Sequence, residues 1–121
     1  MTQELRLNLE RSDGSLAVAA VTGELSLHTA PDLHTGASEW IRQGHHHLIL
    51  DLQHVGFCDS SGLSALIRIW HSAKEADGTL TLAAVPDRLM RMLNLTGLDS
   101  LLIVHPTVHH ALSTHRPTAD A

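Results

Sequence analysis

The chain has 121 residues and a formal net charge of −5, and it is 43% hydrophobic but only 2% aromatic. This length suits one domain with a single core, while one lysine and seven scattered arginines leave no basic surface for nucleic acid. Cys58 is the sole cysteine, which excludes an internal disulfide, and no apolar run reaches the roughly 18 residues that cross a bilayer.

Two strands and a tight turn are predicted at the start of the chain. Leucines alternate with polar residues over 4–10, which is typical of a strand with one face in water, and 16–22 is a more apolar strand. Asp13 and Gly14 lie between the two strands and are typical turn residues. The two strands are therefore expected to form an antiparallel hairpin.

A helix and a buried strand are expected next. Thr29 can cap the helix, Pro31 suits its first turn, and Gly44 can end it. The run 48–52 is apolar except for Asp51, as expected for a central strand that is covered on both faces.

The second half of the chain alternates helices with strands. Apolar residues spaced by three and four predict a helix from Ser61 to about Asp77, and 79–85 reads as a strand. A short helix is expected from Pro86 to Leu95, followed by a strand over 101–104 and a last helix that begins at Pro106.

This order predicts an α/β fold with a mixed sheet of about five strands and about four helices packed against it. We expect one domain over 1–115, and the apolar-poor segment 116–121 is expected to be a disordered tail. The N-terminal residues lack the basic and apolar segments of a secretion signal, so a cytoplasmic protein without membrane insertion is expected.

Several motifs in this order resemble a known family. They are Thr-Gly-Glu-Leu at 22–25, Asp-Leu at 51–52, Asp-Ser-Ser-Gly-Leu at 59–63 and Leu-Thr-Gly-Leu at 95–98. With the order of elements, they resemble the STAS domain, and in particular the bacterial anti-sigma factor antagonists. The resemblance covers roughly 5–113, and the motif at 59–63 is fairly specific in its strand-to-helix setting.

The resemblance implies a regulatory function and no enzymatic activity or cofactor. In that family the first serine after the aspartate is the phosphoacceptor, which corresponds to Ser60 here. The implied partner is an anti-sigma factor that is also a serine kinase. The unphosphorylated antagonist sequesters that kinase and frees a sigma factor, phosphorylation breaks the complex, and a protein phosphatase resets the switch.

The resemblance also implies a partner-binding surface around Ser60. Its expected members come from the loop before the first helix, from the start of the next helix and from that helix's outer face: Ser26, Leu27, His28, Asp59, Ser61, Gly62, Ser64 and Arg68. The family commonly has an aspartate where this chain has Ser26, so one carboxylate near the phosphoacceptor is missing. Ser26 would then repel a nearby phosphate less, or would itself be a second acceptor.

The residues alone leave other roles open at this helix start. A serine or aspartate that precedes a helix often caps it by accepting a backbone N–H, so spacing alone favours a cap at Ser60, whereas the resemblance favours phosphorylation. Capping and phosphorylation can coexist because both use the same helix start. Asp59 is interpreted either as a cap or as a partner contact, and Ser61 as a cap or neighbour and not as the acceptor.

Cysteine and histidine chemistry is a weaker alternative. Cys58 follows His54 by four residues, which suggests a nucleophile, but a buried apolar cysteine is the preferred interpretation. Histidines cluster at 45–47 and around the last helix, where His105 and His109 are four apart. A solvated surface is favoured there over a metal site. Glycine spacing does not suggest nucleotide binding.

One further function remains open from the sequence. STAS domains also serve as subunits of stress-signalling complexes or of membrane lipid transport assemblies. In such assemblies the domain packs constitutively against its partners.

Overall fold

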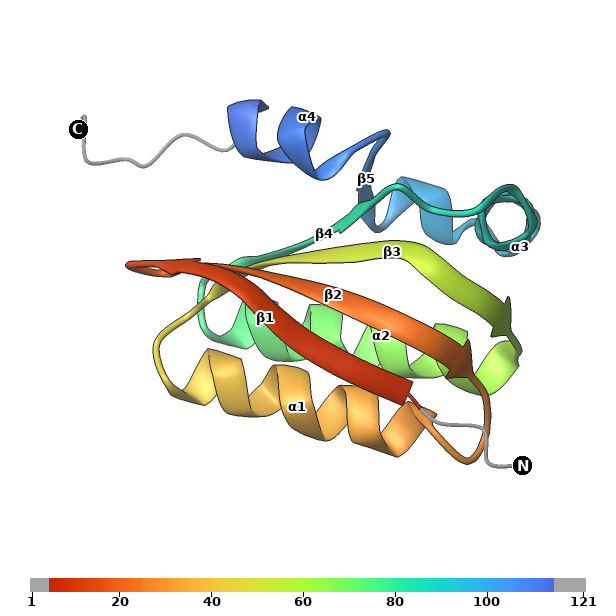
Figure 1. Ribbon diagram of the computed structural model, residues 1–121, viewed down its shortest axis with the longest axis horizontal. Helices are drawn as coiled ribbons and strands as arrows, with labels where there is room; N and C mark the ends of the chain where they lie inside the picture. The colour runs from red at the N-terminus through yellow and green to blue at the C-terminus, as the bar shows by residue number, and fades with distance from the viewer. Residues whose placement is uncertain (1–4, 115–121) are drawn as a thin grey trace.

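The computed structural model describes residues 5–114, and the predicted tail at 116–121 lies outside them. Five strands form one mixed sheet in the order β1-β2-β3-β4-β5 (Figure 1). The elements follow the chain as β1 (Leu5–Asp13), β2 (Leu16–Leu25), α1 (Ala30–Arg42), β3 (His47–Cys58), α2 (Ser60–Glu75), β4 (Thr79–Ala83), α3 (Asp87–Thr96), the 3-10 turn η1 (Leu98–Ser100), β5 (Ile103–His105) and α4 (Val108–Thr114). The predicted fold class is confirmed.

The sheet has one antiparallel pair and three parallel pairs. β1 and β2 form the predicted hairpin through a turn at Gly14, whose φ of 63° lies in the left-handed region that glycine adopts easily. β2, β3, β4 and β5 then run parallel to one another. Each parallel pair needs a crossover, which explains why helices separate these strands along the chain.

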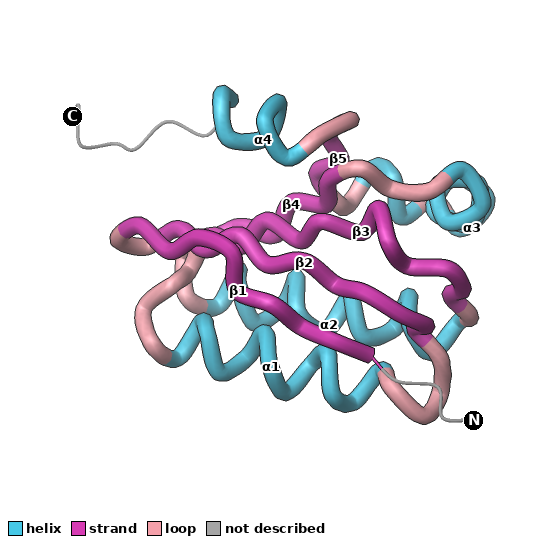
Figure 2. Tube along the Cα trace, in the orientation of Figure 1, coloured by secondary structure: helices cyan, strands magenta, loops and turns pink. Residues whose placement is uncertain are grey.

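The two faces of the sheet carry different helices. α1 and α2 lie side by side below the sheet, and α4 lies above it (Figures 1 and 2). Successive β3 residues divide between the two layers, because Leu48 and Leu50 belong to the main core while Ile49 belongs to a smaller cluster with Ala111 of α4. The main core is aliphatic, as the low aromatic content required.

β3 differs most from the sequence prediction. A strand was expected over 48–52, yet β3 extends to Cys58 because β2 pairs with it as far as Leu25↔Cys58. Gln53, His54 and Gly56 interrupt the apolar pattern, so only the partner strand holds this stretch extended. The consequence is that β3 delivers the following helix start to the end of β2.

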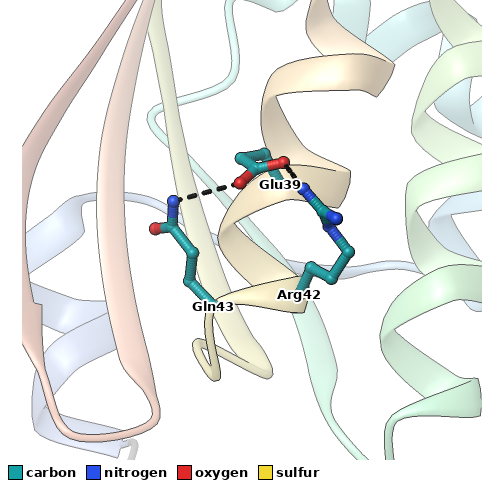
Figure 3. A network of polar contacts seen from close by, with 3 residues as sticks. All are labelled: Glu39, Arg42 and Gln43. Carbon is teal, nitrogen blue, oxygen red and sulfur yellow. Dashed lines mark hydrogen bonds and ion pairs between the residues drawn. The ribbon is translucent and has the colours of Figure 1, made fainter.

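The first helix ends in a small exposed network. Arg42 forms an ion pair with Glu39, and Gln43 donates a hydrogen bond of 3.3 Å to the other carboxylate oxygen of Glu39 (Figure 3). Gly44 follows with a φ of 107°, in agreement with the prediction that it ends the helix. Because these side chains are exposed to solvent, the network contributes little to stability.

No helix within residues 5–114 combines the length and the apolar content that a membrane crossing requires.

Candidate functional site

The candidate site lies where β3 passes into α2. Asp59 is the single residue between them, and its backbone is extended. Its carboxylate accepts the backbone N–H of Ser61 at 2.8 Å and that of Gly62 at 3.2 Å. Asp59 is therefore the helix cap, one of the two roles that the sequence left open for it.

Ser60 is freed from capping by this arrangement. It is the first residue of α2 and it is exposed, and its hydroxyl forms no hydrogen bond within residues 5–114. The start of a helix carries the positive end of the helix dipole, which stabilises added negative charge by about 0.3–1 kcal/mol. Ser60 thus presents a free hydroxyl where a phosphate would be tolerated by the fold.

Gly62 joins this helix start to the end of β2. A Cβ at Gly62 would come within 2.7 Å of Cys58 Sγ, 2.9 Å of Leu25 Cβ and 3.0 Å of Leu25 O. The backbone N–H of Asp59 also donates to the carbonyl of Leu25 at 3.0 Å. Gly62 was expected at the partner-binding surface, but it is buried and its role is close packing.

The loop between β2 and α1 forms the second half of the site. Ser26 was expected to face a partner, yet it is only 7% exposed. Its N–H donates to Thr29 Oγ1 at 2.9 Å, and its hydroxyl accepts the N–H of His28 at 3.3 Å. Thr29 therefore holds this loop through its side chain. The prediction that its side chain caps α1 is wrong, because the hydroxyl donates to the carbonyl of Glu24 instead. The loop's exposed members are Leu27, at 68% exposure, and His28.

Two further predicted residues lie on the outer face of α2. Ser64 and Arg68 are exposed and follow Ser60 at successive spacings of four, so the three share one side of the helix. Arg68 also acts on α1. The pKa of His34 in that helix is lowered mainly by partial burial and further by the positive charge of Arg68. A cationic group therefore lies on the same face as the candidate phosphoacceptor.

Cys58 has the properties of a packed thiol. Burial, and then the neighbouring Asp59 carboxylate, raises its pKa to about 11, and its S–H donates to the carbonyl of Asp59 at 3.4 Å. A nucleophilic cysteine instead needs a lowered pKa. No hydrogen bond joins it to His54 within the described chain. Cys58 is half-buried and packs against the main core, which favours the apolar interpretation over the nucleophile.

The histidines near the C-terminus do not have the arrangement that their spacing in the sequence suggested. His105 lies in β5, so it does not share a helix face with His109. Its Nδ1 is instead 2.8 Å from Nδ1 of His110. Among residues 5–114, no three histidine, cysteine, aspartate or glutamate side chains converge as metal ligands would.

Sequence reasoning missed a hollow beside this site. A cavity of about 260 Å³ lies between the end of β3 and α3, and its lining includes Val55, Phe57, Leu89 and Met92. The only signal in the sequence was Phe57, the single phenylalanine, which is 43% exposed. Its position beyond the predicted strand gave no reason to expect a cavity there.

The mixed sheet, with helices on both faces and a capped helix start after β3, defines an α/β domain. The STAS domain family matches residues 6–111, which is most of the chain, and the chain belongs to that family. The resemblance stated from the sequence is therefore confirmed.

Known proteins of similar sequence and structure agree with this assignment. An anti-sigma-B factor antagonist from Staphylococcus aureus is 28% identical over 102 residues, which cover 84% of this chain and 94% of the relative. An anti-sigma factor antagonist from Mycobacterium paratuberculosis superposes with a TM-score of 0.83 at 29% identity, covering 94% of this chain and 96% of that one. The Bacillus cell fate determinant SpoIIAA in its phosphorylated form has the same fold, with a TM-score of 0.73, 20% identity and coverages of 92% and 100%. The family of anti-sigma factor antagonists is non-enzymatic.

Proposed function

We propose that this protein binds and sequesters an anti-sigma factor that is also a serine kinase, and that phosphorylation of Ser60 ends the complex and a protein phosphatase restores it. The observation that carries the proposal is the free, exposed hydroxyl of Ser60 at a helix start that Asp59 already caps. The relatives named anti-sigma factor antagonists and the phosphorylated form of a structural neighbour support it.

The proposed partner surface follows from exposure around Ser60. Leu27 and His28 from the loop, Ser61 and Asp59 from the helix start, and Ser64 with Arg68 from the outer face of α2 would contact the kinase. Ser26 and Gly62 would support this surface from below, since both are buried.

Phosphorylation would change the charge of this surface and leave the fold intact. A phosphoserine carries about −1.5 to −2 charges near neutral pH and would lie beside the Asp59 carboxylate. A partner surface that fits a neutral hydroxyl would have to desolvate this dianion. A loss of about 2.8 kcal/mol would lower the affinity about a hundredfold.

The experiment is phosphorylation by the cognate kinase with ATP, followed by mapping of the modified residue. We expect one phosphate on the wild type and on Ser61→Ala, and none on Ser60→Ala. Ser61 is the matched control because it is adjacent and is also a serine. Phosphate retained by Ser60→Ala would reject the assigned site.

The alternative role, as a subunit of a stress-signalling or membrane lipid transport assembly, predicts a different result. A complex with scaffold or transporter components that survives phosphatase treatment and tolerates Ser60→Asp would favour it. The switch instead predicts that Ser60→Asp weakens the complex with the kinase.

A further inference from the structure

β3 has an unpaired edge over its last residues. The ladder between β3 and β4 ends at Asp51↔Ala83, whereas β3 continues to Cys58 with β2 as its neighbour on the other side. Figure 1 shows β3 running on past the end of β4, with α3 above its last residues. A strand edge of this kind has backbone N–H and C=O groups available to another extended chain, apart from the N–H of Gln53, which donates to Asp51 Oδ1 at 3.1 Å.

The hollow described above lies against this edge. Val55, Gly56, Phe57 and Cys58 of β3 form one of its walls, and residues of α3 and its preceding turn form the other. Phe57 is 43% exposed, although a large apolar side chain is normally covered. A backbone edge beside an apolar hollow is the arrangement that strand addition uses, with main-chain bonds for affinity and a side-chain pocket for specificity.

The charge at the rim indicates the chemistry of the occupant. Arg88 lines the hollow, is exposed, and has no ion-pair or hydrogen-bond partner within residues 5–114. The neighbouring Asp87 lies in the first turn of α3 and forms no ion pair with it. A free guanidinium favours a carboxylate, which it binds in a bidentate geometry.

We propose that the edge of β3 over 52–58 and the facing side of α3 form a groove for an extended acidic segment of a partner protein. The segment lies along β3 as an added strand, inserts one apolar side chain between Phe57 and Met92, and directs a carboxylate to Arg88. The groove ends at Cys58, two residues before Ser60, so a partner bound at Ser60 reaches it without a long linker. This contact is separate from the phosphoserine switch and does not depend on it.

The glycine in the groove offers a way to block it. A Cβ added at Gly56 meets nothing within 4 Å, so this position accepts a side chain, and Gly56→Trp adds a bulky one at the wall of the groove. Two arginines of α3 provide a matched pair, because Arg88 lines the hollow whereas Arg91 is exposed on the same helix outside it. Arg88→Glu reverses the charge in the groove, and Arg91→Glu makes the same change of net charge elsewhere.

The test selects random dodecapeptides displayed on phage against the immobilised full chain, and then maps a selected synthetic peptide by amide chemical shifts. We expect enriched sequences in which acidic and apolar residues alternate, and shifts centred on 53–58 and Arg88. Gly56→Trp and Arg88→Glu should each weaken the peptide at least about tenfold, while Arg91→Glu stays within about twofold. Far-ultraviolet circular dichroism checks that each variant is folded.

Five results would overturn the groove. They are no enriched sequence, enrichment of basic peptides, a peptide that binds Gly56→Trp as well as the wild type, shifts that map elsewhere, and equal losses for the two arginine variants. Because the selection uses unphosphorylated protein and no kinase, its failure leaves the role of Ser60 to its own test.

Discussion

Substitution of Gly62 by alanine tests whether the start of α2 is pressed against the end of β2 as described. The new Cβ would meet Cys58 Sγ at 2.7 Å, Leu25 Cβ at 2.9 Å and Leu25 O at 3.0 Å. A shift of the thiol alone does not relieve the contacts, since one of them is to a backbone oxygen. Overpacking of this kind costs about 1–3 kcal/mol, and the higher helix propensity of alanine offsets up to about 1 kcal/mol. We expect a net loss of about 1–2 kcal/mol.

The assay is equilibrium urea unfolding, and the matched control is Gly56→Ala. A Cβ at Gly56 meets nothing within 4 Å, so the control should stay within about 0.5 kcal/mol of the wild type. The midpoint for Gly62→Ala should fall with an unchanged slope, because the same surface is exposed on unfolding. Equal midpoints for the two alanine variants would refute the close contact between α2 and β2.

Three further predictions concern individual side chains. Asp59→Ala should lower the free energy of unfolding by about 1 kcal/mol and Asp59→Asn by much less, because asparagine keeps an acceptor oxygen for the helix start; equal losses in urea unfolding would contradict the capping role. Because the pKa of Cys58 is raised to about 11, alkylation of its thiol by iodoacetamide should be slow at neutral pH and should become faster as the pH rises. Fast alkylation at neutral pH would instead show a lowered pKa. Burial and the adjacent His110 lower the pKa of His105 from 6.5, so His105 binds a proton more readily in the unfolded chain than in the folded one. Its contribution to stability should be complete above pH 6.5 and be lost as the pH falls through the lowered pKa, and His105→Gln should flatten that part of the stability profile.

The parts of the fold that follow from local pattern were predicted well. The hairpin at Gly14, the end of α1 at Gly44 and the alternation of helices with strands depend on turn chemistry and periodicity, which the sequence displays directly. The predicted strand-to-helix junction is also confirmed, because Ser60 is the first residue of α2.

The features that were missed arise from contacts between distant segments. Gln53 and His54 look like loop residues, and only the pairing with β2 makes them part of β3. Ser26 turns inward because Thr29 binds its backbone, and a polar loop sequence does not reveal that bond. The free edge beside Phe57 results from a difference in length between β3 and β4, which neither strand shows alone.

The most direct test of the central claim is the affinity of the cognate anti-sigma factor kinase for this protein carrying phosphoserine only at position 60. Genetic-code expansion would install the modified residue, and isothermal titration would compare it with the unmodified chain. We expect the phosphorylated protein to remain folded and to bind about a hundredfold more weakly. Equal affinity of the two forms for the kinase would contradict the claim that a charge at Ser60 controls the complex.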